Sequence, residues 1–392
     1  MKIAIDARWI FKEISGIGNY TRQLLTQFGR IAPKETQFLI IFNDPQLKER
    51  TINETGLADA VNFEAQCLPW GVFSPQSQLR LPGYLKKEKV DIFHSPNYMI
   101  PLLAFPRGRA SKIKCITTIH DLIPLIFPNH APKSRKSRMF PLFKAIMNEV
   151  GRRSDAIITV SNASRRDILK QLHIPESQSD KVHTVYNGVS EMFTPAGTAD
   201  KTNSSEAGQT LLYVGRADPY KNLETLIKAL SIVRNTTELP VRLLLAGSPD
   251  PRYPGAENIA KELNLEEHVK WTGYLSDEEL IETYRSADIL VHPSRYEGFG
   301  LQIIEAMACG TPVVCSNGGS LPEVAGEAAI QVDPDDAAGF AAAITKVLTQ
   351  PEAAANMRKK GFKQAADFTW KNAARKILAV YNNVAGGTDN TP

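Results

Sequence analysis

Short apolar runs alternate with amphipathic, helix-like stretches along almost the whole chain. The runs are apolar at consecutive positions rather than at every second position, and this favours strands that are buried on both faces, as in a parallel sheet covered by helices. In the first half they read KIAID, FLIIF, VDIFH, CITTIH, AIITV and VHTVYN, and in the second half LLYVG, RLLLAG, VKWTG, DILVHP and PVVCS. The pattern therefore predicts an α/β protein with parallel sheets.

A polar, poorly periodic segment divides this pattern into two similar halves. Residues 191–209 contain PAGTADKTNSSEAGQ, after which the strands restart at LLYVG much as they began at IAID. Since 392 residues exceed a comfortable single core, we expect two Rossmann-like domains, residues 1–190 and 210–369, with parallel sheets facing a central ligand-binding cleft. We expect a helix at about 370–385 to pack back on the first domain and the tail 386–392 to be disordered.

The composition is that of an ordinary globular protein and excludes some classes of partner. Hydrophobic residues make up 43% of the chain, charged residues 22%, and the net charge of +4 is small for this length. The sequence has no Lys/Arg-rich run with interleaved aromatic residues, so we expect no nucleic-acid partner. The start, MKIAIDARWIF, carries Asp6 and Arg8 and reads as a strand rather than a signal peptide. The longest apolar stretch, residues 98–106, is far too short to span a membrane.

The four cysteines indicate a reducing compartment. Cys67, Cys115, Cys309 and Cys315 show no spacing typical of metal ligands, and two of them lie in apolar strand-like runs. We therefore interpret all four as reduced thiols, mostly buried, in a cytoplasmic protein.

Residues 292–314 contain the densest group of candidate functional side chains. An apolar strand leads into a loop and a tight glycine turn, and an apolar helical run follows. A helix that begins at such a turn offers unpaired N–H groups and a partial positive charge, which suit a phosphate. A carboxylate on either side suits a ligand with hydroxyls on both sides of a phosphate, such as a nucleotide sugar; a plain strand-to-helix connection is the alternative. The candidate ligand-binding residues are Glu297, Gly298, Phe299, Gly300, Leu301 and Glu305.

Two cations follow the strand LLYVG. Arg216 comes directly after its last glycine, Lys221 follows five residues later, and Asn222 is the expected N-cap of the next helix. Both cations would project from the same strand-to-helix edge and offset the roughly two negative charges of a diphosphate. A solvated surface pair explains the spacing equally well.

Three further candidates lie in the first half. Gly16 and Gly18 form a G-x-G turn ahead of the helical pattern TRQLLTQF, and glycines there let backbone N–H groups approach a ligand closely. His120 closes the strand CITTIH. The alternatives are a plain turn and a hydrogen-bonded structural histidine.

A metal site is not expected. Asp333-Pro334-Asp335 has the D-x-D form of a metal-binding motif, but it directly precedes the helical pattern AAGFAAAITKVL. We therefore interpret Asp335 or Asp336 as a residue that favours the helix N-terminus. Other carboxylates and histidines do not cluster in the sequence, and we expect no metal and no cofactor.

Residues 133–153, KSRKSRMFPLFKAIMNEVGRR, form a basic and apolar stretch with a single acidic residue, Glu149. Pro141 indicates that a regular helix either starts or kinks near it. Such a stretch suits a docking surface for an anionic membrane that holds a lipid-linked acceptor, so the protein would be peripheral on the inner face of that membrane. An ordinary surface helix with an apolar face is the alternative.

Taken together, these motifs resemble the family 4 retaining glycosyltransferases. Glu297 and Glu305 match the E-x7-E motif of that family. The flanking segments HPSRYEGFG and EAMACGTPVV, and the segments GR-x4-KN and THDLIPL, match sequences typical of the family. The resemblance implies the two-Rossmann GT-B fold and transfer of a hexose from a nucleoside diphosphate with retention of configuration. It also implies that Arg216 and Lys221 bind the diphosphate and that His120 and Glu297 serve the donor sugar. The loop with Gly16 and Gly18 would lie beside the distal phosphate and the acceptor.

The first half resembles one branch of the family in particular. DARWI, SGIGNYT, FHSPN and THDLIP are similar to members that build bacterial surface polysaccharides, often from GDP-mannose. The resemblance implies a nucleotide-sugar donor and a glycan or lipid-linked acceptor, with mannose the first choice. A nucleotide-sugar epimerase or other non-transferase enzyme, or a catalytically silent nucleotide-sugar-binding subunit, would suit the same two-domain fold.

Overall fold

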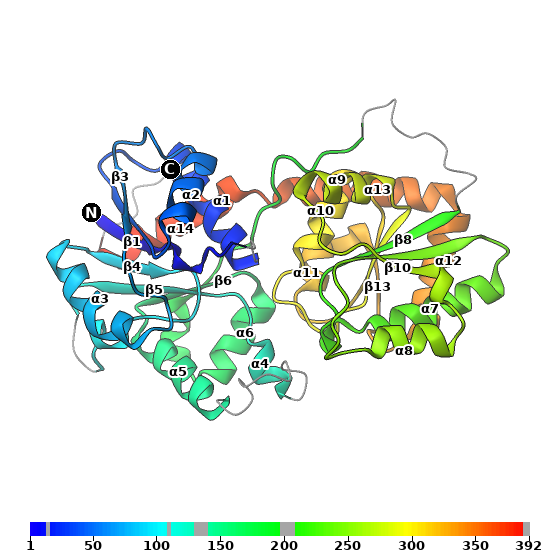
Figure 1. Cartoon of the computed structure of the whole chain (residues 1–392), viewed down its shortest axis with the longest axis horizontal. Coiled ribbons are helices and arrows are strands. Elements are labelled where there is room, and N and C mark those ends of the chain that lie inside the picture. Colours follow the sequence, from blue (N-terminus) through cyan, green and yellow to red (C-terminus); the bar gives the residue numbers. More distant parts are fainter. Residues whose placement is uncertain (13–15, 108–110, 129–139, 197–207, 387–392) are drawn as a thin grey trace. The chain divides into compact units, whose positions relative to one another are not determined.

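The computed structural model describes residues 1–12, 16–107, 111–128, 140–196 and 208–386 (Figure 1). The chain forms two compact units. The first comprises Met1–Leu122, Arg138–Gly188 and Trp370–Pro392, and the second comprises Ile123–Ser137 and Val189–Thr369. Most of the predicted linker, residues 197–207, and most of the predicted tail, residues 387–392, lie outside the described residues.

The first unit is built on a seven-stranded parallel sheet in the order β3-β2-β1-β4-β5-β6-β7. Its strands are β1 (Lys2–Asp6), β2 (Gln37–Phe42), β3 (Phe63–Cys67), β4 (Ile92–Ser95), β5 (Lys114–Ile119), β6 (Ala156–Thr159) and β7 (Val182–Thr184). Its helices are α1 (Gly16–Ile31), α2 (Pro45–Thr55), α3 (Pro75–Lys87), α5 (Phe140–Arg153), α6 (Asn162–Gln171) and α14 (Trp370–Val384), with short turns η1 (Ala7–Trp9), η2 (Leu102–Ala104) and η5 (Glu176–Lys181).

The second unit repeats this plan with a six-stranded parallel sheet in the order β10-β9-β8-β11-β12-β13. Its strands are β8 (Gln209–Val214), β9 (Val241–Ala246), β10 (Val269–Trp271), β11 (Ile289–His292), β12 (Val313–Ser316) and β13 (Ala329–Val332). Its helices are α4 (Ile123–Ile126), α7 (Leu223–Thr236), α8 (Gly255–Glu262), α9 (Asp277–Ser286), α10 (Leu301–Cys309), α11 (Leu321–Ala325), α12 (Ala337–Thr349) and α13 (Pro351–Asp367), with η6 (Pro219–Lys221), η7 (Glu266–His268) and η8 (Gly326–Ala328).

The central strands are buried on both faces, as their continuous apolar pattern predicts. Every residue of β4, β6, β11 and β12 is buried. Two strands are absent from the sequence prediction, β3 and β13. Each lies at one edge of its sheet, where only one neighbouring strand covers the backbone; the strands at the opposite edges, β7 and β10, were predicted. The side chains of β3 and β13 are partly exposed, so they lack the apolar signal of a central strand.

The strand order brings two loops of the second unit together. β8 and β11 are hydrogen-bonded neighbours, although helices and two other strands separate them in the sequence. The order of strands reverses at this pair, and a parallel sheet has its usual ligand crevice outside the carboxyl ends at such a point. Residues 215–222 after β8 and residues 293–300 after β11 both leave the sheet there. The first unit has the equivalent reversal between β1 and β4.

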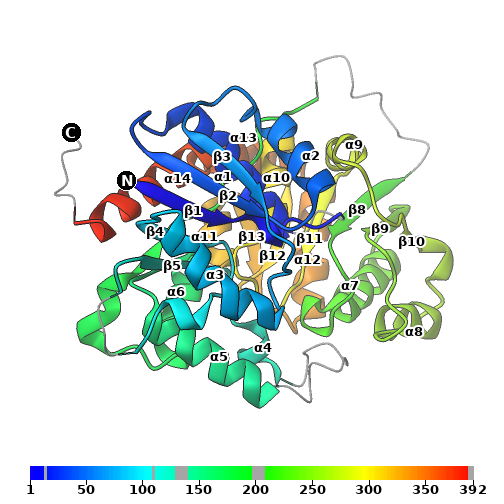
Figure 2. The same ribbon diagram turned by 60° about the vertical axis from the view of Figure 1, so that its left-hand side comes forward.

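The C-terminal helix α14 belongs to the first unit and packs against α1 (Figures 1 and 2). Its Tyr381 hydroxyl lies 2.6 Å from Nδ1 of His94 on β4, and both residues are fully buried. Trp370 at the start of α14 meets the ring of Tyr20 edge-on. The C-terminal helix α14 therefore packs into the core of the first unit, together with α1 and β4.

Residues 123–128 depart from the predicted domain boundary. We expected them in the first domain, whereas they group with the second unit. The ring of Phe127 packs edge-on against that of Tyr296, with centroids 6.0 Å apart. This aromatic contact is long-range and leaves no trace in the local sequence pattern.

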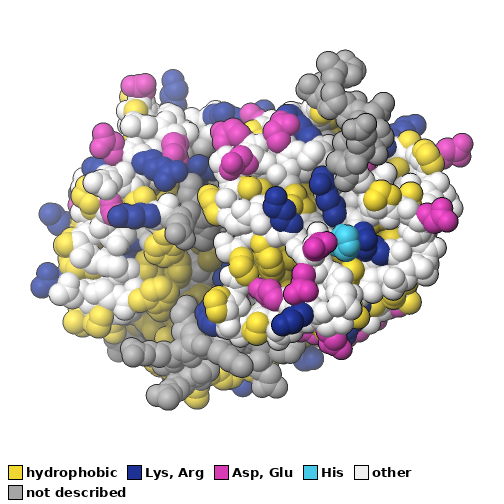
Figure 3. Space-filling model, turned by 45° about the vertical axis from the view of Figure 1, so that its right-hand side comes forward, with side chains coloured by type: hydrophobic (Ala, Val, Ile, Leu, Met, Phe, Trp, Pro, Cys, Tyr) yellow, Lys and Arg dark blue, Asp and Glu magenta, His cyan; other side chains and the backbone are white. Residues whose placement is uncertain are grey.

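The surface charges are of mixed sign, and the cysteines form no disulfides. On the face shown in Figure 3, lysines and arginines are interspersed with aspartates and glutamates rather than gathered into a single-sign stripe. All four cysteines are free, and three are buried, Cys115, Cys309 and Cys315. Among the helices that the structure describes, none is both long and apolar enough to cross a bilayer.

Candidate active site

The loop after β8 carries the two predicted cations. The strand ends at Val214, η6 spans Pro219–Lys221, and α7 begins at Leu223. Asn222 occupies the N-cap position of α7, as predicted, but in a left-handed conformation with φ of 59° and with no side-chain bond to the helix backbone. Its amide nitrogen instead donates to the carbonyl oxygens of Pro293 and Pro334. The residue therefore ties this loop to the loop after β11.

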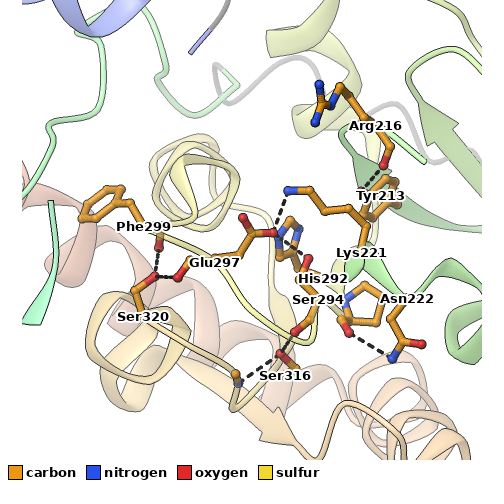
Figure 4. A network of polar contacts seen from close by, with 12 residues as sticks. Tyr213, Arg216, Lys221, Asn222, His292, Ser294, Glu297, Phe299, Ser316 and Ser320 are labelled. Carbon is orange, nitrogen blue, oxygen red and sulfur yellow. Dashed lines mark hydrogen bonds and ion pairs between the residues drawn. The ribbon is translucent and has the colours of Figure 1, made fainter. Parts of the chain in front are cut away.

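Lys221 and Glu297 meet where the two loops come together (Figure 4). The ammonium Nζ of Lys221 lies 2.7 Å from Oε1 of Glu297, and the two residues are 8% and 7% exposed. Nε2 of His292, the last residue of β11, lies 2.9 Å from the same carboxylate oxygen. Because a carboxylate oxygen only accepts, the His292 proton resides on Nε2. One carboxylate oxygen thus receives two hydrogen bonds.

The charges of this pair stabilise each other. Burial by itself would raise the pKa of Glu297, but the ammonium of Lys221 and the hydrogen bond from His292 hold that pKa below its usual range. Burial would likewise lower the pKa of Lys221, and the carboxylate of Glu297 outweighs it, so that pKa is raised. Both groups are therefore charged at neutral pH.

Arg216 differs from Lys221 in its surroundings. Its side chain is 74% exposed and pairs with Asp218, with Nη2 and Oδ2 2.7 Å apart. The ammonium of Lys221 points to Glu297, whereas the guanidinium of Arg216 lies apart from that carboxylate (Figure 4). The two cations share a loop, but only one of them is built into the buried network.

The glycine turn ahead of α10 has the predicted form. Gly300 has φ of 94°, a conformation that side chains rarely adopt, and an added Cβ would lie 2.7 Å from Leu321. The helix α10 begins directly after it at Leu301, which confirms that the helix N-terminus opens at this turn. The hydroxyl of Ser320 donates to the carbonyl oxygens of Glu297 and Phe299 at 3.0 and 2.8 Å (Figure 4). These bonds fix the backbone of the turn that follows Glu297.

Glu305 lies a little over one turn inside α10 and is separate from the Lys221 network. It is only partly exposed, and its Oε2 accepts a hydrogen bond of 2.8 Å from the hydroxyl of Tyr284 on α9. Burial raises the pKa of Glu305 to about 7, against the smaller opposing effect of the Tyr284 bond. The two glutamates of the motif therefore differ, since one is firmly ionised and the other titrates near neutrality.

His120 lies in the first unit, directly after β5. Its Nε2 lies 3.0 Å from the carbonyl oxygen of Pro96, so Nε2 donates and Nδ1 is left as the acceptor nitrogen. The ring of Tyr20 meets it edge-on, with centroids 4.7 Å apart. Burial lowers the pKa of His120 to about 4, so the imidazole is neutral at physiological pH.

The predicted turn with Gly16 and Gly18 requires a correction. The helix α1 begins at Gly16, so both glycines lie in its first turn rather than in a loop ahead of it. Tyr20, one turn further along α1, is the residue that contacts His120. The N-terminus of α1 is therefore close to His120 within the first unit.

The aspartates in and next to the D-x-D motif bond to groups of the protein itself. Oδ1 of Asp336 accepts from the backbone N–H of Gly339 and caps α12, as one of the two predicted aspartates should. Asp335 pairs with Arg295. Among the described residues, no group of three or more His, Cys, Asp or Glu side chains is arranged to hold a metal ion.

The sequence analysis did not identify three residues that surround Glu297: His292, Ser294 and Ser320. The hydroxyl of Ser294 lies 3.2 Å from Nε2 of His292. His292 ends a central strand and His120 directly follows one, so a position at the carboxyl end of a strand was the available signal. Ser320 follows the pair Gly318-Gly319, where an added Cβ at Gly319 would lie 2.6 Å from the carbonyl oxygen of Glu297. That close approach requires a glycine.

Comparison with known proteins gives the family of the chain. The family model of glycosyltransferase family 4 matches residues 14–191, and that of glycosyl transferases group 1 matches residues 198–364. The chain belongs to glycosyltransferase family 4. It is a glycosyltransferase, as the two models and its relatives together indicate.

Two relatives show which enzymes the chain is similar to. The O-antigen chain mannosyltransferase B of Escherichia coli is 28% identical over 97% of this chain and 99% of its own. The MMP alpha-(1->4)-mannosyltransferase of Mycolicibacterium hassiacum is 33% identical over 61% of this chain and 56% of its own.

Solved structures identify the fold of this family 4 chain as GT-B. Sucrose-phosphate synthase from Thermosynechococcus elongatus superposes with a TM-score of 0.75 at 22% identity and covers 98% of this chain and 99% of its own. A glycosyltransferase from Rickettsia africae superposes with a TM-score of 0.69 at 18% identity, covering 99% of each chain. The predicted architecture of two Rossmann-like domains is thereby confirmed.

Proposed function

We propose that the chain transfers a mannosyl residue from GDP-mannose to a hydroxyl of a glycan or lipid-linked acceptor, with retention of the anomeric configuration. The observation that carries this proposal is the buried Lys221–Glu297 pair at the switch point of the second sheet, beside the N-terminus of α10. A cation, a carboxylate and a helix N-terminus together suit a diphosphate that is linked to a sugar. Relatives named mannosyltransferases support mannose as the sugar.

The proposed chemistry follows from the charges. When the bond between the anomeric carbon and the phosphate oxygen breaks, the diphosphate gains negative charge and the sugar becomes oxocarbenium-like. Arg216, Lys221 and the N-terminus of α10 stabilise the leaving group. Glu297 and His120 hold sugar hydroxyls, and the ionised Glu297 also supports the developing positive charge.

Retention follows from attack on the face that the leaving group occupied. The acceptor oxygen bonds to the anomeric carbon as the phosphate leaves, and the acceptor proton passes to the departing phosphate oxygen. A double displacement would need a carboxylate nucleophile beneath the anomeric carbon. Glu297 is held by Lys221 and His292, which suits an electrostatic role better than a nucleophilic one.

Glu305 is proposed to accept hydrogen bonds from the ribose hydroxyls of the donor. It stands a little over one turn along α10 from the glycine turn, and its Oε2 already accepts one hydrogen bond, from Tyr284. A carboxylate has about four lone-pair positions, so three remain for a ligand. No metal or cofactor enters the proposal, because the two cations carry out the electrostatic task that a metal performs in other transferases.

A peripheral position at the cytoplasmic face of a membrane is proposed for the lipid-linked case. Lys133, Arg135, Lys136, Arg138 and Met139 of the basic stretch lie outside the described residues. The described part is α5, which begins at Phe140 with Pro141 in its first turn and exposes Leu142. Leu79 of α3 and Leu103 of η2 are also exposed, and η2 packs against both α3 and α5. Glu149 pairs with Arg107, Arg152 and Arg153, which reduces the net charge of this surface.

The release of free nucleoside diphosphate tests the proposed function. Incubation with GDP-mannose and a mannose-terminated glycan should release GDP at a rate that depends on the acceptor. Consumption of the donor without any acceptor would indicate an epimerase or another non-transferase enzyme. Binding without consumption under any acceptor would indicate a nucleotide-sugar-binding subunit. A thermal-shift screen of GDP-, UDP- and ADP-sugars identifies the donor base independently.

A further inference from the structure

Tyr284 is the hydrogen-bond donor to the carboxylate of Glu305. The residue lies on α9, is completely buried, and places its hydroxyl oxygen 2.8 Å from Oε2 of Glu305 on α10. A phenol can both donate and accept, whereas an ionised carboxylate can only accept. The hydrogen bond therefore runs from Tyr284 to Glu305 whenever the carboxylate is charged.

The position of Tyr284 is fixed from several sides. Its carbonyl oxygen accepts a 2.6 Å hydrogen bond from the hydroxyl of Thr311, and Phe193 packs edge-on against its ring. Its helix starts at a capping box, in which Ser276 and Glu279 bond to each other's backbone N–H. Burial raises the pKa of Tyr284 well above its usual value, so the hydroxyl retains its proton at all physiological pH values.

The bond also determines how Glu305 is oriented. A glutamate side chain on a helix surface samples several rotamers, and ordering it costs free energy when a ligand binds. With Oε2 anchored, the carboxylate is held in one orientation before the ligand arrives. Within the part of the chain that the structure describes, no protein group donates to its Oε1.

We infer that Tyr284 is a positioning residue for nucleotide binding: it anchors Oε2 of Glu305 so that Oε1 accepts from the ribose hydroxyls of the donor. This inference rests on the proposed role of Glu305. Tyr284 itself touches neither the sugar nor the diphosphate in this arrangement. The chemical class that the pair recognises is a ribonucleotide with free 2′- and 3′-hydroxyls.

The test is calorimetric titration of wild type and Tyr284→Phe with GDP or UDP, whichever binds wild type more tightly, and with its 2′,3′-dideoxy analogue. Wild type should prefer the ribonucleotide. Tyr284→Phe should bind the ribonucleotide about 5- to 20-fold more weakly, which is less than the full effect of a lost hydrogen bond to a charged group, because the lost bond acts on the ligand only through Glu305. Its affinity for the dideoxy analogue should change less than about twofold, since that ligand offers no hydroxyl for Glu305. In kinetics the KM for the donor should rise while kcat is retained.

Tyr381→Phe is the matched control, because it removes the hydroxyl of another fully buried tyrosine in the other unit. It should leave both nucleotide affinities unchanged. Thr311→Val is the second variant should Tyr284→Phe fail to fold. It releases the Tyr284 carbonyl but keeps the hydroxyl, and it should reduce the same ribonucleotide preference to a smaller extent.

The outcomes separate this inference from the function on which it rests. If wild type binds both ligands equally, Glu305 does not read the ribose, and the proposed donor orientation is overturned together with the role of Tyr284. If wild type prefers the ribonucleotide and Tyr284→Phe retains the full preference, only the positioning role is overturned. A variant that loses both affinities equally would indicate a general loss of structure and would overturn it too.

Discussion

Lys221 and Glu297 stand 76 residues apart in the sequence and form a buried ion pair, with Nζ and Oε1 2.7 Å apart. The resemblance to family 4 implies that the lysine binds the diphosphate and the glutamate the sugar, and in the structure each is the other's partner. Under the proposed function, a donor diphosphate would share Lys221 with Glu297. Donor binding would then weaken part of this ion pair.

Arg216 and Lys221 should respond differently to removal. Arg216→Ala should lower kcat/KM. The loss should correspond to about 2–4 kcal/mol of transition-state stabilisation, because a charge-assisted contact to the leaving group is lost. Its side chain is largely exposed, so folding should remain intact. Lys221→Ala should show a similar kinetic loss and also destabilise the fold by about 3 kcal/mol, since Glu297 is left buried without its ion-pair partner. Steady-state kinetics and urea unfolding measure the two effects.

The exposed pair Lys360–Glu327 in the same unit supplies the control. Lys360→Ala should change neither kinetics nor stability by more than about 1 kcal/mol, as for other surface ion pairs. Near-normal turnover in folded Arg216→Ala would remove the diphosphate assignment for Arg216.

The two glutamates should separate binding from transfer. Glu305→Ala should weaken the affinity for free nucleoside diphosphate, because the ribose loses its acceptor. Glu297→Gln keeps the size and hydrogen-bonding capacity of the side chain but removes its charge. It should therefore retain most of the nucleotide affinity while transfer falls by about 2–4 kcal/mol in activation free energy. Titration and single-turnover kinetics measure the two quantities, and a reversed pattern would mean that the donor binds in the opposite orientation.

Glu305 should also make stability depend on pH. Its pKa of about 7 in the folded protein exceeds the ordinary value, so the unfolded chain releases this proton first and stability falls as pH rises from about 4.5 to about 7. Glu305→Gln cannot ionise. It should therefore exceed wild type in stability by about 1–3 kcal/mol near pH 8 and match it near pH 4.5. Denaturant unfolding at both pH values checks this, and an equal difference at both would exclude titration of Glu305 as the cause.

Activity should survive chelation. In the proposed mechanism, Arg216, Lys221 and the N-terminus of α10 supply the field that a divalent cation would otherwise provide. Transfer rates measured in EDTA should equal those in buffer with magnesium or manganese. Loss of transfer in EDTA, followed by recovery on adding either metal, would contradict the proposed metal-free mechanism.

Binding to anionic liposomes tests the proposed docking surface around α5. Each basic residue near an anionic membrane contributes about 1 kcal/mol, and this attraction is screened by salt. Co-sedimentation should rise with the anionic lipid fraction and fall with ionic strength. Replacing Arg135, Lys136 and Arg138 by glutamate should abolish it while nucleotide affinity is retained. If wild type does not bind at low salt, α5 is an ordinary surface helix and a soluble acceptor is favoured.

The sequence alone determined the class of fold and the local form of the glycine turn and helix that follow Glu297. Continuous apolar runs are produced by burial on both faces of a parallel sheet, so they identified the central strands of both units. The glycines and the apolar run after Glu297 likewise predicted where α10 begins, because a left-handed turn and a helix start are local features. The edge strands β3 and β13 were missed, since partial exposure weakens that signal.

Only the tertiary structure decided which side chains meet. The order of strands in a sheet is set by long-range pairing, and it makes neighbours of the loops that carry Lys221 and Glu297. The same holds for Tyr284 and Glu305, which lie on different helices, and for Phe127, whose aromatic partner assigns its segment to the second unit. Burial and bonding partners then set the pKa of each carboxylate. The ammonium of Lys221 keeps the pKa of Glu297 low, whereas burial raises the pKa of Glu305 to about 7. Two glutamates of one motif acquire different properties because desolvation and pairing depend on neighbours in space rather than in sequence.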